Sequence, residues 1–414
     1  GLERGQYSIE GRVLMIKDVA ISRVTWVSAG AGGALEETVK NAFTLALGEG
    51  SAANVSLGYL NGTLTTSGDK VYQITNTGGT KINLNGVYNR GETLPSGNLN
   101  YRGDIWMDIS GGAFGIISGG VTNEWSTKLQ TSTLTGDTHV QLSGNATAEH
   151  VIGGNNKGAS TTLTGNTNVT VKDNAIVAGA IIGGSTSAHN AVTTITGNTS
   201  VLVTNVQYYN TAQNLDGGLS NSYIIGGSSW SSNTTSGTTI QGSTSATINL
   251  NGITLSGTEE HNSFVKTIIG GSYGNVNNAG TVNNINGDTS VSIIGREGIT
   301  FTGDIIGGSF ENSGQAQYTI GGNSSISISG GSTFTGNIYG GSYSKVPGNT
   351  GSTMTTAGNI TVELGTGTYR GNIYGAGNKG TAGGDVLVSL TGGSVFGAEG
   401  QDGGITVGGS AGAA

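Results

Sequence analysis

The side chains best suited to binding or catalysis gather in two insertions of the sequence. The first insertion carries Tyr208, Tyr209, Asp216 and Tyr223, the second carries Glu259, Glu260, His261 and Phe264, and the corresponding stretch of the following repeat carries Arg296 and Glu297. Aromatic rings beside carboxylates can stack on a saccharide or contact a protein surface. We therefore expect a ligand-binding surface made by Tyr208, Tyr209, Asp216, Tyr223, Glu259, Glu260, His261, Phe264 and Arg296. The alternative is that both insertions are solvated loops without a ligand.

The acidic residues of these insertions also allow a catalytic interpretation. Two carboxylates, such as Asp216 with Glu259 or Glu260, serve in glycoside hydrolysis when they are held several ångströms apart. Adjacent residues usually point apart, however, and loops make poor rigid sites. The sequence therefore predicts no catalytic residue and a protein that is not an enzyme.

The remaining motifs that could carry chemistry have simpler interpretations. Arg102–Asp104 reads RGD, but "YRGDIW" from Tyr101 matches "YRGNIY" from Tyr369, which predicts a turn residue at Asp104 in the position that Asn372 fills. The four His residues lack paired spacing, Cys is absent, and no tandem GGxGxD repeat occurs. We expect neither a metal site nor a cofactor.

Two alternating sequence elements must position these residues. The first is an apolar pair followed by two glycines, as in "IIGGS" at Ile181, Ile224 and Ile268. The second is a small turn followed by alternating apolar and polar residues, as in "TGNTNVTV" from Thr164 and "TGNTSVLV" from Thr196. Strict alternation of the two elements along the chain indicates a true internal repeat.

The second element has the period-two pattern of a β-strand, with Val201 and Val203 facing inward and Ser200, Leu202 and Thr204 facing outward. The first element is a short apolar strand, and its glycines are expected to permit a sharp corner at positive φ. Units made of short strands cannot bury an apolar face alone, but stacked units can. The two longest repeats are adjacent, so their insertions should emerge side by side on one face.

The sequence therefore predicts an all-β fold, a right-handed parallel β-helix (β-solenoid) with a small N-terminal capping region that contains one helix. Residues 1–110 form the expected cap and early coils, and residues 111–414 form the repetitive solenoid. The helix is expected from Ala34 to Leu47, because Leu35, Val39, Ala42, Phe43, Ala46 and Leu47 follow helical spacing. Such a helix would shield the open end of the stack.

The composition excludes several classes of protein. Of 414 residues, 78 are Gly, 2 are Pro and none is Cys, which excludes a disulfide-stapled scaffold and a collagen-like chain. No apolar run approaches the length of a transmembrane helix. The net charge of −8 is spread widely, without a basic stripe, so we expect no nucleic-acid partner.

In repeat style and composition, residues 110–414 resemble the passenger region of a bacterial autotransporter or a related large adhesin. The resemblance implies an extracellular protein displayed at the bacterial outer membrane, attached only through a domain outside this sequence. We expect a non-enzymatic adhesin, presented as a rod, that binds a glycan or protein of a host or neighbouring cell. One alternative is a filament or matrix subunit that self-associates by end-to-end stacking. The other is a polysaccharide-cleaving parallel β-helix enzyme.

Overall fold

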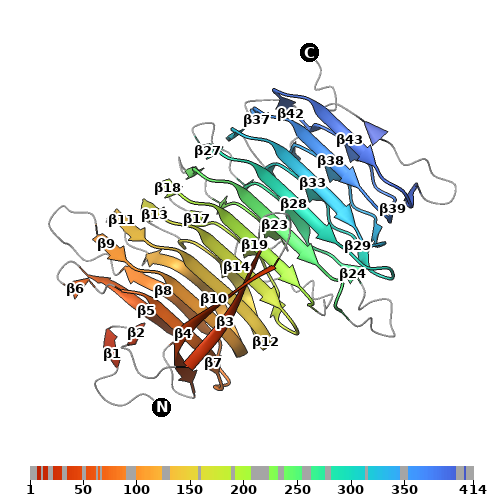
Figure 1. The fold of residues 1–414 in the computed structure, drawn as a ribbon. Coiled ribbons are helices and arrows are strands. Elements are labelled where there is room, and N and C mark those ends of the chain that lie inside the picture. Colours follow the sequence, from red (N-terminus) through yellow and green to blue (C-terminus); the bar gives the residue numbers. More distant parts are fainter. Residues whose placement is uncertain are drawn as a thin grey trace.

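A computed structural model of the chain describes residues 7–10, 13–16, 22–29, 35–48, 53–61, 64–65, 68–89, 99–123, 131–156, 160–187, 192–206, 223–231, 237–253, 263–275, 281–312, 316–345, 353–397 and 405–406. Within these ranges every regular element is a β-strand, and the strands stack along one axis (Figure 1). In the same ranges no helix is long and apolar enough to cross a membrane. The predicted all-β class is therefore confirmed.

The strands form one large sheet and three smaller ones. One ladder of the large sheet follows the Thr-Gly-Asn turns, and we call it the TGN ladder: β7 (Lys70–Asn76), β10 (Ile105–Asn123), β12 (Thr138–Ile152), β14 (Thr167–Lys172), β19 (Thr199–Thr204), β23 (Thr244–Asn249), β28 (Thr289–Ile294), β33 (Ser324–Ser329), β38 (Ile360–Leu364) and β43 (Val386–Leu390). A second ladder of this sheet, the IIGG ladder, contains β16 (Ile181–Ile182), β20 (Tyr223–Ile225), β25 (Thr267–Ile269), β30 (Ile305–Ile306), β35 (Ile338–Tyr339), β40 (Ile373–Tyr374) and β45 (Ile405–Thr406).

The other sheets complete each repeat. The nine-stranded sheet contains β9 (Leu99–Arg102), β11 (Ser132–Thr135), β13 (Thr161–Thr164), β18 (Val192–Ile195), β22 (Gly237–Ile240), β27 (Val282–Ile285), β32 (Gln317–Ile320), β37 (Met354–Thr356) and β42 (Gly380–Ala382). The six-stranded sheet contains β17 (Thr186–Ser187), β21 (Ser229–Ser231), β26 (Tyr273–Asn275), β31 (Phe310–Glu311), β36 (Ser342–Ser344) and β41 (Gly377–Asn378). The five-stranded sheet contains β24 (Ser263–Phe264), β29 (Thr300–Phe301), β34 (Thr333–Phe334), β39 (Gly367–Tyr369) and β44 (Ser394–Phe396).

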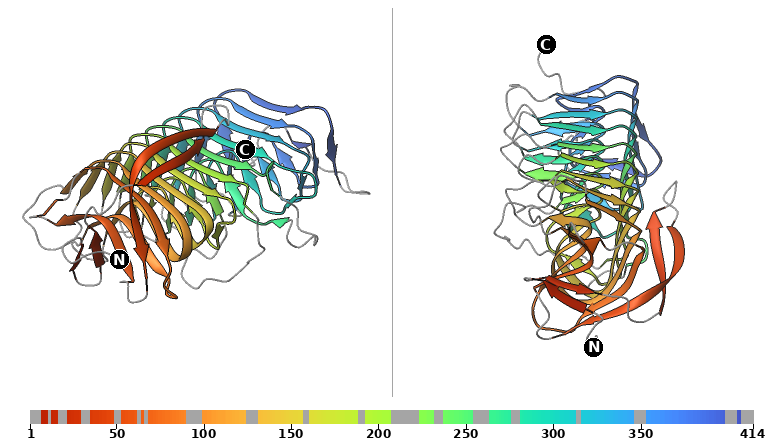
Figure 2. Two further views of the ribbon diagram at one scale, coloured as in Figure 1. Left: turned by 60° about the horizontal axis from the view of Figure 1, so that its bottom comes forward. Right: turned by 90° about the vertical axis from the view of Figure 1, so that its left-hand side faces the viewer.

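Successive repeats pair in parallel and in register. The chain runs through β18, β19, β20 and β21, and the next repeat places β22, β23, β25 and β26 directly beside them. Figure 2 shows the resulting stack from two further sides. Stacked parallel sheets of this kind are typical of a parallel β-helix, as the repeat predicted.

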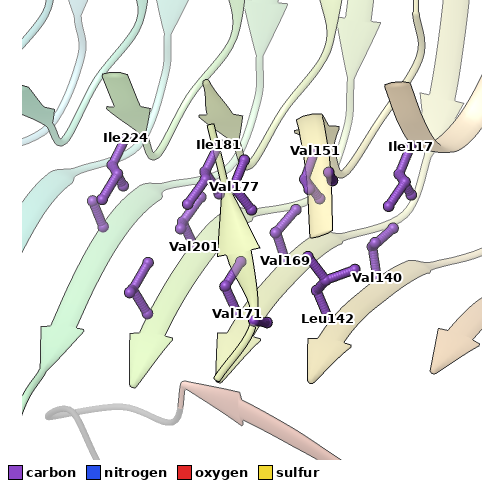
Figure 3. Packing of buried hydrophobic residues seen from close by; sticks show 14 of the residues in the cluster. Ile117, Val140, Leu142, Val151, Val169, Val171, Val177, Ile181, Val201 and Ile224 are labelled. Atoms are coloured by element: carbon purple, nitrogen blue, oxygen red, sulfur yellow. The ribbon is translucent and has the colours of Figure 1, made fainter. Parts of the chain in front are cut away.

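Inward-facing side chains of the two ladders of the large sheet meet in the interior. Val201 and Val203 are 0 % and 2 % exposed, which confirms the predicted inward row. They lie in line with the valines of neighbouring repeats and face the first isoleucine of each apolar pair, such as Ile181 and Ile224 (Figure 3). Leu202, expected to face solvent, is only 1 % exposed. A hairpin near the N-terminus of the chain, which packs on the outer face of the TGN ladder, covers Leu202.

The N-terminal helix prediction is wrong. Leu35–Leu47 forms strand β4, which pairs antiparallel with β3 (Ser22–Ala29) and in parallel with β7 through residues 43–47. Leu45 and Leu47 are buried while Thr44 is exposed, so this half of the segment alternates with period two. Strand β3 supplies backbone hydrogen bonds to residues 35–42 and β7 supplies them to residues 43–47, and this pairing outweighs the helical spacing of the apolar residues.

The remaining N-terminal strands are β1 (Tyr7–Glu10), β2 (Val13–Ile16), β5 (Asn54–Asn61), β6 (Leu64–Thr65) and β8 (Ile82–Asn89), followed in the next repeats by β15 (Ile176–Val177). They combine two antiparallel pairs, β1 with β2 and β5 with β6, with parallel pairing to the strands that follow. Strand β5 pairs in parallel with β2 and β8, and β8 pairs in parallel with β10. Strand β10 itself runs through the expected boundary at residue 110.

The two sequence elements are joined by a recurring hydrogen bond. The first Thr of β12, β14, β19 and β23, and Ser324 at the start of β33, donate their hydroxyls to the carbonyl of the first glycine in the following apolar-pair element. Thr167 donates to Gly183 at 2.5 Å, and Thr244 donates to Gly270 at 2.6 Å. All of these groups are buried. The bond explains why the Thr and the glycine recur together.

The glycines of the apolar-pair element are required for space and not for positive φ, so the predicted reason was wrong. Gly226 and Gly270 do not adopt the left-handed region. A Cβ on Gly226 would lie 2.5 Å from the carbonyl oxygen of Gly270. The backbones of successive repeats approach so closely at this corner that no side chain fits.

Side chains also form hydrogen-bonded ladders along the stack. The serine after each glycine pair accepts the backbone N–H of its counterpart in the preceding repeat, as Ser272 does from Ser228 at 3.1 Å. At the corner before the TGN strands, the Asn166 N–H donates to Asp137 Oδ1 at 2.7 Å, and the Asn198 N–H donates to Asn166 Oδ1 at 2.9 Å. These ladders fix the register of neighbouring repeats.

Asp104 belongs to this corner ladder. It accepts the Asp137 N–H at 2.9 Å, and its own N–H donates to Asp69 at 2.9 Å. Asp104 is therefore a turn residue, as expected. The predicted equivalence with Asn372 is wrong, because Asn372 donates to Asn337 in a separate ladder before the IIGG strands.

We expect Ser272→Ala to lower the free energy of unfolding by about 1–3 kcal/mol, because the buried Ser228 N–H loses its acceptor. Ser329→Ala, at an exposed position of β33, should change it by less than about 0.5 kcal/mol. Urea unfolding followed by circular dichroism measures both variants. Equal effects of the two substitutions would contradict a stabilising role for the serine ladder.

Candidate ligand-binding site

Most of the residues expected in the ligand-binding surface lie outside the described residues: Tyr208, Tyr209, Asp216, Glu259, Glu260 and His261. The described segments that flank the two insertions belong to adjacent repeats, because β19 pairs with β23 and β20 pairs with β25. The structure describes the three other expected residues, Tyr223, Phe264 and Arg296, and places each in a different setting.

Phe264 is a core residue. It lies on β24, is 1 % exposed, and its ring centroid is 4.9 Å from that of Phe301. Phe334 and Tyr369 extend the same internal stack at 4.9 Å and 5.2 Å. The side chain of Phe264 therefore stabilises the interior of the five-stranded sheet and is not presented to a ligand.

Tyr223 joins an aromatic cluster on the outer side of the IIGG ladder. Its ring centroid lies 4.5 Å from that of Tyr273, which in turn lies 5.6 Å from that of Phe310. These rings cover the second isoleucine of each apolar pair, such as Ile269 and Ile306. Burial, together with the neighbouring Tyr223, raises the pKa of the Tyr273 hydroxyl well above its ordinary value. The apolar pair thus serves two cores, one on each side of the sheet.

Arg296 lies in the turn after β28. Its backbone N–H donates to the Ser332 hydroxyl at 2.8 Å, and its carbonyl accepts from the same hydroxyl at 2.8 Å. Its side chain is partly exposed. The described contacts of Arg296 therefore hold the turn to the next repeat.

A trough that no short sequence motif indicates lies on the outer face of the TGN ladder. Its volume is about 850 Å³, within the range of ligand-binding clefts. It extends across β12, β14, β19, β23, β28 and β33. The lining residues are Asp137, His139, Asn166, Asn168, Asn198, Thr199, Ser200, Ser243, Thr244, Ser245, Thr247, Asp288, Ser290, Val291, Ser292, Ser325 and Ser327.

Because side chains alternate between the two faces of a strand, residues two apart on β23, β28 and β33 line the trough together. Ser245, Ser290 and Ser325 occupy equivalent outward positions on successive strands, and they pair in register. Ser292 and Ser327 form a second outward row beside them. The corner ladder that contains Asp137 and Asp288 forms one side of the trough. Hydroxyl, amide and carboxylate groups are thus repeated along the axis of the stack.

The N-terminal hairpin of β3 and β4 lies across the same outer face (Figures 1 and 2), with β3 against β14 and β19. Outward residues on these two strands are buried: Thr170 is 3 % exposed and Leu202 is 1 % exposed. The equivalent residues on later strands, Ser327 and Glu363, are exposed. The hairpin therefore accounts for the unexpected burial of Leu202 and limits the open part of the face.

A polar network occupies the end of the trough nearest the N-terminus. The rings of Trp106 and His139 stack with their centroids 3.4 Å apart. His139 Nδ1 lies 3.3 Å from the Asn168 amide nitrogen, and the Ser200 hydroxyl donates to Asn168 Oδ1 at 2.6 Å. These contacts orient the side chains before any ligand arrives, which lowers the entropic cost of binding.

The carboxylates of the trough are used as acceptors within the corner ladder. Asp137 accepts the Asn166 N–H at 2.7 Å, and Asp288 accepts the Asn323 N–H at 2.7 Å. The two carboxylates directly precede β12 and β28, and three other strands of the ladder lie between these two. Across the described residues, no group of three His, Asp or Glu side chains could hold a metal ion.

Comparison with known proteins finds no match: no protein-family model matches the chain, and no curated protein or solved structure shows significant similarity to it. The site must therefore be interpreted from its own geometry.

Proposed function

We propose that the chain is a non-enzymatic adhesin, secreted or displayed on a bacterial cell surface as a right-handed β-solenoid rod. The trough on the TGN ladder is the described surface that contacts a glycan or protein of another cell. The observation that carries this proposal is its extent, because it crosses six successive strands of the stack. The resemblance of the repeats to autotransporter passengers supports display outside the cell.

Two further features favour binding over catalysis. Asp137 and Asp288 are each engaged by a backbone N–H of the following repeat, which suits a structural acceptor better than a proton-transfer group. The in-register ladders also make the stack stiff, since each repeat is bonded to its neighbours through backbone and side chains. A stiff rod with a continuous polar face can hold a ligand at a distance from its own cell.

The proposal is tested by filling the trough. Ser290→Ile removes a hydroxyl and adds an apolar side chain inside the trough, on the fifth of its six strands, and Thr239→Ile makes a comparable change on the outer face of the nine-stranded sheet. We expect Ser290→Ile to weaken retention on arrays of cell-surface glycans and proteins by about tenfold, and Thr239→Ile to leave it unchanged. If the wild-type chain is retained on no surface, or if both variants behave alike, the proposal fails.

The filament and enzyme alternatives predict different outcomes for the same preparations. A self-associating subunit would form fibres visible by electron microscopy without any added ligand. A polysaccharide-cleaving enzyme would shorten the glycans on which it is retained, and substitution of Glu259 or Glu260 would abolish that cleavage. An adhesin gives single rods and leaves its ligand intact.

A further inference from the structure

We infer that the trough binds an extended, uncharged polysaccharide chain lying parallel to the axis of the stack. This inference rests on the proposed function and specifies the ligand of the same trough. It depends on the chemistry of the lining, on the spacing of the strands and on the charge of the trough.

The lining chemistry suits a ligand rich in hydroxyl groups. Ser245, Ser290 and Ser325 present hydroxyls in one row, and Ser292 and Ser327 present them in the next. Each hydroxyl can both donate and accept a hydrogen bond, as sugar hydroxyls do. Within the described part of the chain, the Ser290 and Ser325 hydroxyls have no hydrogen-bond partner, so a ligand displaces only water from them.

The spacing of the repeats suits a periodic ligand. Neighbouring strands lie about 4.8 Å apart, so the six strands of the trough span about 24 Å along the axis. One pyranose ring in an extended polysaccharide advances by a similar distance. A chain of about five rings could therefore place equivalent hydroxyls against equivalent serines on successive strands.

The composition of the described lining disfavours anionic and apolar ligands. Among the described lining residues, Asp137 and Asp288 are acidic and none is Lys or Arg. An anionic polysaccharide would meet these two carboxylates, and the repulsion would weaken its binding. Val291 is the one aliphatic residue of the described lining, which gives a lipid or an apolar peptide little surface to bury.

Titration calorimetry with the whole chain tests the inference. The probes are neutral β-linked gluco-, manno- and galacto-oligosaccharides of increasing length, with oligogalacturonates as anionic counterparts. We expect affinity for at least one neutral series to rise with length up to about five rings and then level off. The anionic series should bind at least about tenfold more weakly, and neutral binding should be insensitive to salt. Ser290→Ile should weaken neutral binding by about tenfold, whereas Thr239→Ile should not.

Several outcomes would overturn the inference: no binding of any neutral series, tighter binding of the anionic series, affinity independent of length, or equal binding by wild type and Ser290→Ile. The proposed function is judged separately on the arrays. If protein targets retain the chain in a manner lost in Ser290→Ile, the adhesin proposal stands and the polysaccharide ligand is wrong.

Discussion

Replacing Gly270 by alanine is expected to lower the free energy of unfolding by about 3 kcal/mol or more. A Cβ at this position would lie 2.4 Å from the carbonyl oxygen of Gly307 and 3.0 Å from that of Ser290. Both atoms belong to backbone that is bonded into the next repeat, so neither can move without breaking the ladder. Urea unfolding followed by circular dichroism measures the loss.

The matched control is Gly79→Ala, because a Cβ on Gly79 would meet nothing within 4 Å. We expect this variant to unfold within about 0.5 kcal/mol of the wild type. If glycine were required at Gly270 only for backbone flexibility, the two substitutions would lower the free energy of unfolding by similar amounts. Such a result would contradict the close approach of successive repeats at the corner.

The repeats could be predicted because their pattern is local. In "TGNTSVLV" the alternation of Val201 and Val203 with polar neighbours already defines a strand and its inner face. Stacking follows because such short strands cannot bury their apolar side alone. What the alternation cannot show is which outward residues become covered. Leu202 is buried by a hairpin distant in sequence, and no pattern near Leu202 indicates it.

The errors arose where two patterns coincide locally and a distant partner decides between them. Apolar residues between Leu35 and Leu47 fit helical spacing, but Leu45 and Leu47 also fit strand alternation, and pairing with β7 selects the strand. Likewise, Asp104 follows the same short motif as Asn372, but pairing of β9 with β11 assigns it to another corner. Strand partners are not visible in a short stretch of sequence.

The candidate site was missed for a similar reason. Ser290 and Ser325 have the ordinary appearance of solvated strand residues, and only their register on successive strands brings them into one trough. The expected site residues drew attention because aromatic and acidic side chains stand out in a polar sequence. Of these, Phe264 proved to be a core residue, since an aromatic side chain fills the interior as readily as it binds a ligand.

The second large effect concerns Lys266, which is buried in the stack. It is 1 % exposed, and its Nζ donates to the carbonyls of Gly179 at 2.5 Å and Ala178 at 3.3 Å, two repeats away. Burial lowers the pKa of its ammonium group to about 7 from the ordinary value of 10.5. Between these two values the unfolded chain binds a proton that the folded chain does not. Stability should therefore rise with pH across this interval.

The expected gain between about pH 7 and pH 10 is on the order of 4 kcal/mol, and Lys266→Met should abolish it. Above about pH 10 the buried tyrosines oppose the gain, because burial raises the pKa of Tyr273 and Tyr318 and the unfolded chain then loses protons that the folded chain retains. Urea unfolding of wild type and Lys266→Met at several pH values below this limit isolates the lysine, because the tyrosines affect both proteins equally. Lys345→Met, at an exposed position, should give a profile parallel to the wild type. Parallel profiles for wild type and Lys266→Met would instead show that the Lys266 ammonium stays protonated in the fold, held by its carbonyl contacts.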